Sequence, residues 1–218
     1  MQVEDKEVIL LKVSGQDKLG VTAGLSSILA TYDATILDIG QADIHDTLSL
    51  GILFEIKVGC TSGPVLKDLL FKAYELGVKV KFIPISIEDY EIWVKGQRKQ
   101  RYIINVLGET LTAVQLAAVT RILSNQNLNI DSIKRLTGRV SIIEKEEFPR
   151  SCIQLSVTGT IVDKTLMTAS FMEISRTLDV DISFQEDNMY RRNRRLVCFD
   201  MDSTLIQTEV IDELAELA

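Results

Sequence analysis

Residues 8–20 read Val-Ile-Leu-Leu-Lys-Val-Ser-Gly-Gln-Asp-Lys-Leu-Gly, an apolar, β-rich run that ends in a turn with two glycines. The residues that follow place Val21, Leu25, Ile28 and Leu29 on one side of a helix, because this spacing matches the helical period. A strand that passes through a glycine turn into an amphipathic helix is typical of the start of a split βαβ unit. This stretch therefore decides the fold.

Three further strands and one further helix are predicted to complete the unit. The sequence predicts strands over residues 34–39, 50–58 and 78–83, and a helix that begins near Pro64. The last strand alternates at period two, and proline is favoured in the first turn of a helix. The expected order of elements is βαββαβ, a ferredoxin-like unit of the α+β class.

The same pattern starts again at Arg101. Val13-Ser-Gly15 returns as Val106-Leu-Gly108, and the spacing of apolar residues over 76–82 returns over 178–184. Because the elements keep their order, we interpret the chain as an internal duplication, with two tandem βαββαβ domains. The alternative is two unrelated α+β stretches.

Composition and charge exclude several classes of protein. The chain has 218 residues, of which 46% are hydrophobic and 25% charged, the balance of a globular domain rather than a disordered one. Its net charge of −7 is opposite to that of most nucleic-acid binders. No apolar run is long enough for a membrane span, and the acidic N-terminus does not resemble a secretory signal. We expect a cytoplasmic protein with no nucleic-acid partner and no membrane partner.

Cysteine and histidine are too few and too scattered for most metal or thiol chemistry. Cys60, Cys152 and Cys198 lie far apart beside apolar runs, so we expect small reduced core residues. The single histidine, His45, lies in a polar stretch without a nucleophile motif nearby, and we do not expect it to be catalytic.

The duplicated unit resembles the ACT domain, a small regulatory module that binds amino acids in enzymes of amino-acid metabolism. The resemblance rests on the βαββαβ order and on the glycine turn before the first helix. It implies an effector site where free N–H groups of a helix N-terminus favour a carboxylate and an acidic side chain faces an ammonium group. The expected effector-binding residues are Gly15, Asp17, Lys18, Leu19 and Gly20. In the other interpretation, Asp17 caps the helix and the glycines only form the turn.

The second unit departs from this pattern. It keeps Gly108 but continues Glu-Thr-Leu-Thr-Ala113, without the Asp-Lys-x-Gly run of the first unit. We therefore expect it to be a structural or dimerising partner. ACT modules typically pair edge to edge, which would cover open sheet edges. The resemblance implies a homodimer through the ACT-like domains.

A different pattern follows the second unit. Leu196–Phe199 is typical of a buried parallel strand, and it leads through Asp200-Met-Asp202-Ser-Thr204 to a helix after Thr208. At the carboxyl end of such a strand, one carboxylate can attack phosphorus while the other transfers protons. Two carboxylates beside a phosphate need a cation, and Mg²⁺ suits their oxygens.

The stretch 200–215 resembles the first signature motif of the haloacid-dehalogenase superfamily and, within it, the phosphoserine phosphatases. The resemblance implies that Asp200 is the nucleophile that becomes an aspartyl-phosphate and that Asp202 is the general acid/base. It also implies that Mg²⁺ is held by the Asp200 carboxylate and the Asp202 carbonyl, and that Glu209 recognises the amino end of O-phospho-L-serine. Alternatively, Glu209 is only a favourable acid in the first helical turn.

Three functions remain open. The first is a phosphoserine phosphatase of the last step of serine biosynthesis, with the ACT-like pair as its regulatory module and L-serine as the expected effector. The second is a stand-alone amino-acid sensor or dimerisation module, and the third is a related phosphatase for another small phosphate ester. Because the later motifs of the superfamily do not occur in the chain, we expect the chain as given to be inactive.

The expected domain organisation follows from these assignments. The sequence predicts a first ACT-like domain over residues 1–90 and a second over 101–187, joined by a linker over 91–100. A basic linker over 188–195 then leads to the start of a phosphatase domain, of the α/β Rossmann-like type, over 196–218.

Overall fold

The computed structural model describes most of the chain. The described residues are 6–57, 62–96, 99–139, 141, 143, 150–191, 198–200, 206 and 209–217. They belong to two compact units, one within residues 1–98 and the other within residues 99–218, and each unit has its own four-stranded antiparallel sheet.

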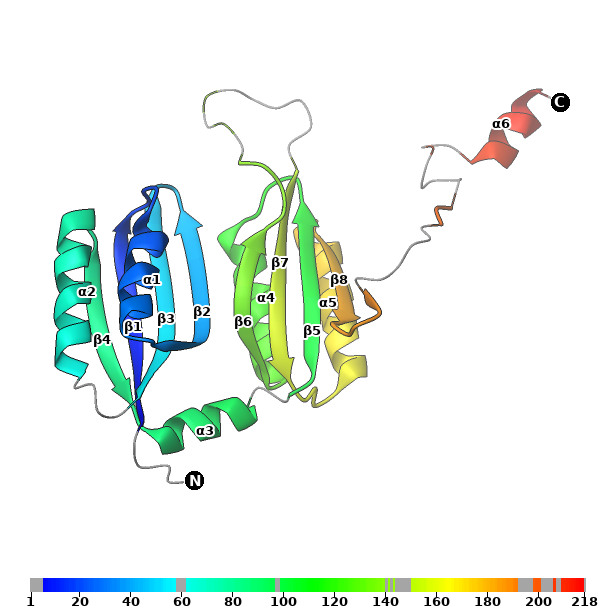
Figure 1. Ribbon diagram of the computed structural model, residues 1–218. Coiled ribbons are helices and arrows are strands. Elements are labelled where there is room, and N and C mark those ends of the chain that lie inside the picture. Colours follow the sequence, from blue (N-terminus) through cyan, green and yellow to red (C-terminus); the bar gives the residue numbers. More distant parts are fainter. Residues whose placement is uncertain are drawn as a thin grey trace. The chain divides into compact units, whose positions relative to one another are not determined.

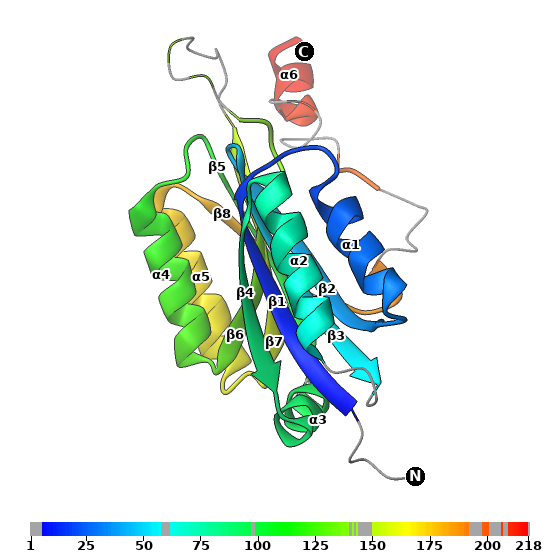
Figure 2. The same cartoon turned by 60° about the vertical axis from the view of Figure 1, so that its left-hand side comes forward.

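The first unit is a βαββαβ domain (Figure 1). Its elements are β1 (Lys6–Gln16), α1 (Val21–Thr31), β2 (Thr35–Ile44), β3 (Thr47–Lys57), α2 (Ser62–Leu76) and β4 (Lys79–Ile85). The sheet order is β2-β3-β1-β4. Figure 2 shows α1 and α2 side by side over one face of this sheet. The core lies in that layer, because Val21, Leu25 and Leu29 of α1 pack on Leu11 and Phe54 of the sheet.

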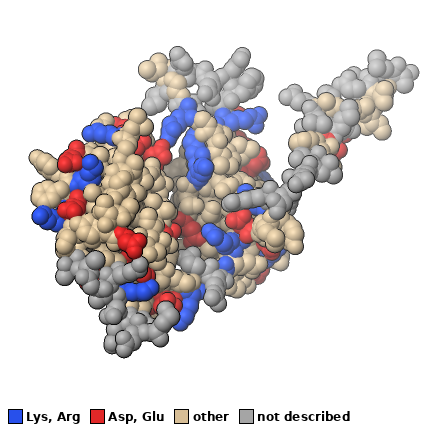
Figure 3. Space-filling view, viewed as in Figure 1, with Lys and Arg blue, Asp and Glu red and all other residues tan. Residues whose placement is uncertain are grey.

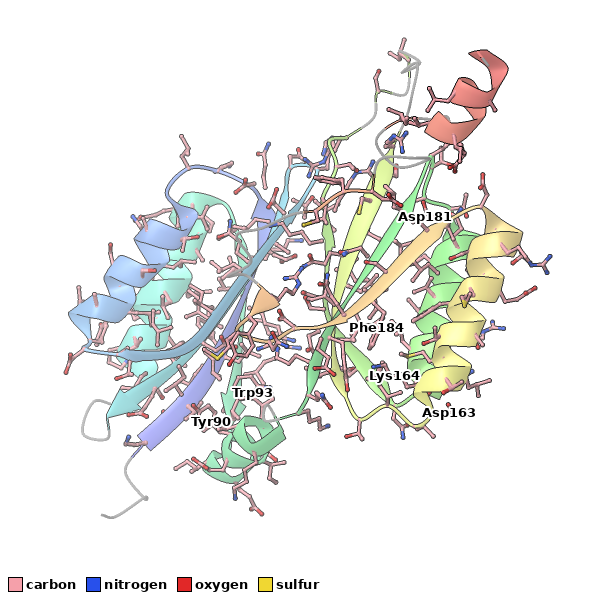
Figure 4. All side chains as sticks on the ribbon, turned by 90° about the vertical axis from the view of Figure 1, so that its right-hand side faces the viewer. Tyr90, Trp93, Asp163, Lys164, Asp181 and Phe184 are labelled. Carbon is pink, nitrogen blue, oxygen red and sulfur yellow. The ribbon has the colours of Figure 1, made fainter. Side chains whose placement is uncertain are left out.

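The second unit repeats this arrangement. Its elements are β5 (Arg101–Gly108), α4 (Ala113–Asn125), β6 (Leu128–Arg135), β7 (Ser151–Gly159), α5 (Lys164–Leu178) and β8 (Asp181–Glu186), followed by α6 (Val210–Leu217). The sheet order is β6-β7-β5-β8. Every second residue of β7 is buried, as expected for a strand with one face on a core. Phe184 on β8, labelled in Figure 4, stacks on Tyr102, and the two ring centroids are 5.1 Å apart.

The two sheets have equivalent registers. Val13 in β1 pairs with β3 on one side and β4 on the other, and Val106 in β5 pairs in the same way with β7 and β8. The predicted α+β class and the tandem βαββαβ repeats are therefore confirmed.

Three local features differ from the sequence-based expectations. Helix α3 (Ile87–Gly96) occupies much of the stretch expected to be a linker over 91–100. Strand β2 extends to Ile44, well beyond the predicted end at residue 39. Cys198 is exposed and Cys152 is half-buried, so neither is the core residue that its apolar neighbours predicted, while Cys60 lies outside the described residues.

Helix α3 lacks the pattern from which a helix is predicted. None of its residues is buried, so it has no apolar face that would reveal a helical period. Its start is fixed by Ser86, whose hydroxyl accepts a hydrogen bond from the Asp89 backbone N–H at 3.0 Å. Tyr90 and Trp93 lie along it with ring centroids 6.0 Å apart (Figure 4). Among the described helices, none is both long enough and apolar enough to cross a membrane.

Candidate functional site

The turn between β1 and α1 is the candidate effector site, and its first glycine is set by packing. A Cβ on Gly15 would lie 3.0 Å from Cγ1 of Val78 and 3.2 Å from its Cα. Val78 is itself buried in the core of the first domain. A larger side chain at position 15 would therefore push against Val78, which would have to shift, so a glycine fits this point best.

The N-terminus of α1 has no side-chain cap. Its N-cap residue, Gly20, has a φ of 90°, and no described side chain accepts a hydrogen bond there. The first turn also contains no acidic residue. Asp17 therefore does not cap α1, which excludes that part of the alternative interpretation. No described side chain caps the backbone N–H groups of this first turn, a position where the helix dipole favours an anion.

The turn is tied to a distant hairpin. The Asp17 backbone N–H donates a hydrogen bond to the Asp46 carbonyl at 2.7 Å, in the tight turn between β2 and β3. Nδ1 of His45 contacts the Asp46 carboxylate, and this hydrogen bond is the main reason that the pKa of Asp46 lies below its ordinary value. A second contact joins the Thr22 hydroxyl to Oε1 of Gln41 at 3.1 Å. None of these partners was predicted from the sequence.

The middle of the turn presents charge and an apolar side chain. Asp17 is exposed, and Leu19 at the tip is fully exposed, with a relative accessibility of 103%. Lys18 reaches back to the end of α2, where its Nζ lies 3.4 Å from the position that a Cβ on Gly77 would take. That position is favourable for a cation, because the carboxyl end of a helix carries partial negative charge. These residues are neighbours in sequence, but their surroundings differ: Gly15 lies against Val78, Lys18 reaches the end of α2, and Leu19 is exposed.

The equivalent turn of the second domain is closed by its own side chains. Thr112 caps α4 by accepting a hydrogen bond from the Gln115 backbone N–H at 3.2 Å. Oε1 of Gln115 in turn accepts a hydrogen bond from the Thr112 backbone N–H at 2.8 Å, and the two bonds together form a capping box. Nε2 of Gln115 also donates to the Leu178 carbonyl at 2.9 Å. Side chains therefore engage two backbone donors at the start of α4, those of Thr112 and Gln115, whereas α1 has no side-chain cap.

The candidate phosphatase residues are described only in part. Phe199 and Asp200 are exposed, and Glu209 is exposed directly before α6. Asp202 lies outside the described residues. Within the described part of the chain, no group of three or more His, Cys, Asp or Glu side chains could hold a metal ion. The Mg²⁺ site expected at Asp200 and Asp202 therefore stays a prediction, and the Asp200 carboxylate is an oxygen donor of the type that Mg²⁺ prefers.

Charged side chains of both signs lie on the surface that Figure 3 shows. On the face drawn in Figure 3, Lys and Arg side chains are interspersed with Asp and Glu side chains.

Comparison with known proteins identifies both domains. An ACT domain model matches residues 7–83, and a second ACT domain model matches residues 101–185. The chain is 32% identical to a phosphoserine phosphatase of Streptomyces coelicolor and 28% identical to Phosphoserine phosphatase SerB2 of Mycobacterium tuberculosis. Each alignment covers 98% of this chain but only 48% and 49% of the relative, so the chain spans about half the length of these relatives.

A solved structure supports the tandem fold. A protein from Galdieria sulphuraria, described as an unknown protein, superposes with a TM-score of 0.66 over 84% of this chain and 99% of its own. The sequences are only 17% identical, so this likeness concerns the fold alone.

Proposed function

This chain contains two ACT domains, and we propose that they form the amino-acid-binding regulatory region of a phosphoserine phosphatase. The observation that carries the binding role is the uncapped N-terminus of α1 behind the turn from Gly15 to Gly20. The relatives that align with nearly the whole chain are named phosphoserine phosphatase, which supports the assignment to that enzyme.

The chemistry of the turn suits an α-amino acid. The ligand carboxylate would accept hydrogen bonds from the N–H groups at the start of α1. The exposed Asp17 carboxylate, in the same turn, would pair with the ligand ammonium group. We propose L-serine as the ligand, because it is the product that such a phosphatase releases. Binding would stiffen the link between the turn and the hairpin that the bond from Asp17 to Asp46 already makes.

We further propose that Asp200, Asp202 and Glu209 carry the catalytic part of the function in a protein as long as these relatives. An Asp200 oxygen would attack phosphorus and break the bond to the serine oxygen, while Asp202 gives that oxygen a proton. Water would then attack phosphorus as Asp202 takes its proton, which breaks the bond to the Asp200 oxygen and releases phosphate. Glu209 would pair with the substrate ammonium group. Mg²⁺, when bound, would offset the negative charge of phosphate and carboxylate.

The first domain also supports a homodimer. Strand β4 is an edge of its sheet, and Leu70, Phe71 and Tyr74 of α2 are exposed beside it, around a hollow of about 730 Å³. Pairing of two such edges would cover both an unpaired strand and an apolar patch. Sedimentation analysis is expected to give a dimer that Tyr74→Lys weakens, and a monomer for the wild type would contradict this part of the proposal.

Amino-acid binding is tested on the chain itself by calorimetry with L-serine and a panel of other amino acids. We expect saturable binding of L-serine that Asp17→Asn abolishes. The matched control is Glu109→Gln, which changes an exposed acid in the equivalent turn of the second domain and should leave binding intact. Absence of binding by any amino acid to the folded chain would contradict the regulatory role.

The catalytic proposal is tested in a protein of the relatives' length by phosphate release from O-phospho-L-serine with Mg²⁺. Asp200→Asn should abolish release, and Glu209→Ala should weaken the preference for phosphoserine over other phosphate esters. Release from other esters with no effect of Glu209→Ala would instead favour a related phosphatase. Amino-acid binding without any phosphatase activity would favour a stand-alone sensor.

A further inference from the structure

The sheet face of the first domain that points away from α1 and α2 carries a group of three lysines. Val13 lies in the core and Val80 packs against it. Because side chains alternate between the two faces along a strand, the adjacent Lys12, Lys79 and Lys81 lie on the opposite face. All three lysines line a hollow of about 500 Å³ and are exposed.

The strand register brings two of these lysines directly opposite each other. Lys12 of β1 pairs with Lys81 of β4, and in the next row Ser14 pairs with Lys79. Directly opposite residues have Cβ atoms only about 5 Å apart, and like charges in that position destabilise a sheet. No ion pair within the described part of the chain includes any of the three lysines.

In the rows of these lysines, the neighbouring strand β3 presents only glycine and serine. Lys12 pairs on its other side with Gly51, which in turn pairs with Gly40 of β2. Ser14 pairs in the same way with Ser49. Three ammonium groups therefore border a shelf of glycine backbone and serine hydroxyls. Every polar side chain around it can donate a hydrogen bond, and only the two hydroxyls can also accept one.

Protection of the sheet edge does not account for this group. Lysines on an edge strand discourage wrong pairing, which could explain Lys79 and Lys81 on β4. Lys12, however, lies on the central strand β1, where it only adds repulsion. In a chain with a net charge of −7, a group of three lysines on one sheet face is a local exception.

We propose that this face of the first domain is a binding site for a small phosphate dianion, either free or as a phosphate monoester. Two negative charges would relieve the repulsion between Lys12 and Lys81, and the phosphate oxygens would accept hydrogen bonds from the ammonium groups and from Ser14 and Ser49. The site is separate from the turn at Gly15–Gly20 and does not depend on the function proposed for that turn.

Calorimetry of the full chain at low salt with inorganic phosphate tests the site. We expect the double variant Lys12→Gln/Lys81→Gln to weaken binding roughly tenfold or more, because each lysine contributes charge-assisted hydrogen bonds. Lys134→Gln, an exposed strand lysine of the second domain, is the matched control and should not change affinity. Asp17→Asn should not change it either, which separates this site from the amino-acid site.

Two further measurements separate a phosphate site from a general anion site and from a purely structural role of the lysines. Glycerol phosphate as titrant distinguishes a monoester site from a free-phosphate site, and tighter binding of citrate than of either would overturn the choice of phosphate. Without ligand, Lys12→Gln should leave the melting temperature unchanged or raise it, since it removes a repulsion. A lowered melting temperature together with unchanged phosphate binding would show that the lysines are structural, and would overturn the inference.

Discussion

The starts of α1 and α4 occupy the same place in two copies of one fold, yet only one of them is capped by side chains. Gly20 leaves α1 without a side-chain cap, whereas Thr112 and Gln115 close α4 with a capping box. Each uncapped N–H group is a donor that water or a ligand must satisfy. This difference supports our proposal that the first domain binds the ligand, and the role of the second domain as a structural or dimerising partner stays a prediction.

The two turns also differ in the segments to which they are hydrogen-bonded. The first turn reaches outward, through the bond from Asp17 to Asp46 in a hairpin of another part of the domain. The second turn bonds inward, through Gln115 to the carbonyl at the end of α5. A ligand on the first turn could therefore alter a hairpin, while the second turn would have to break its own bonds to admit one.

The largest loss of stability is expected from Gly15→Val, which disrupts the packing of the open turn, the turn from Gly15 to Gly20 before the uncapped helix α1. The new side chain would collide with Val78, and overpacking of this kind costs about 1–3 kcal/mol. Denaturant unfolding measures the loss. The matched control, Gly40→Val, adds the same side chain where a Cβ would meet nothing within 4 Å, and it should cost clearly less. Equal losses in both variants would mean that Gly15 is not required by its packing.

A smaller effect is expected from Thr112→Ala, which opens the closed turn. Loss of an N-cap hydroxyl costs about 1 kcal/mol, which denaturant unfolding again measures. The corresponding change near the open turn, Thr22→Ala, removes only an exposed bond to Gln41 and should stay within about 0.5 kcal/mol. If Thr22→Ala cost as much as Thr112→Ala, the contrast between the two turns would not hold.

The smallest effect concerns pH and the hairpin behind the open turn. The hydrogen bond from His45 keeps the pKa of Asp46 below its ordinary value of 3.8. A carboxyl whose folded pKa is lowered stabilises the fold above its unfolded pKa, and this contribution is lost as the pH falls through the folded value. NMR titration should find Asp46 below 3.8 in the wild type and closer to 3.8 in His45→Ala. An unchanged value in the variant would remove His45 as the cause.

Most of the fold could be predicted from the sequence because its signals are local. Val21, Leu25 and Leu29 face the core at the spacing that predicts α1, and the repeat of Val13-Ser-Gly15 as Val106-Leu-Gly108 predicts the second domain. The exceptions lack such a signal. Helix α3 buries no residue, and the extension of β2 to Ile44 is exposed throughout, so neither has a burial period that the sequence could reveal.

The candidate site was predictable only in its local part. The residues of the first turn were found because glycines and the start of a helix are adjacent in sequence. Asp46, by contrast, reaches the turn through the pairing of β1 with β3, a contact between distant segments that no local pattern contains. The catalytic roles of Asp200, Asp202 and Glu209 and the limits of the predicted domains stay predictions.

Amide chemical shifts measured during titration with L-serine test the contrast between the two turns most directly. The amides of Val21, Thr22 and Ala23 at the start of α1 are expected to shift and to saturate together. The amides at the start of α4, around Gln115, should stay unchanged. Shifts of equal size at both helix starts, or at α4 alone, would contradict the claim that the open turn of the first domain is the amino-acid site.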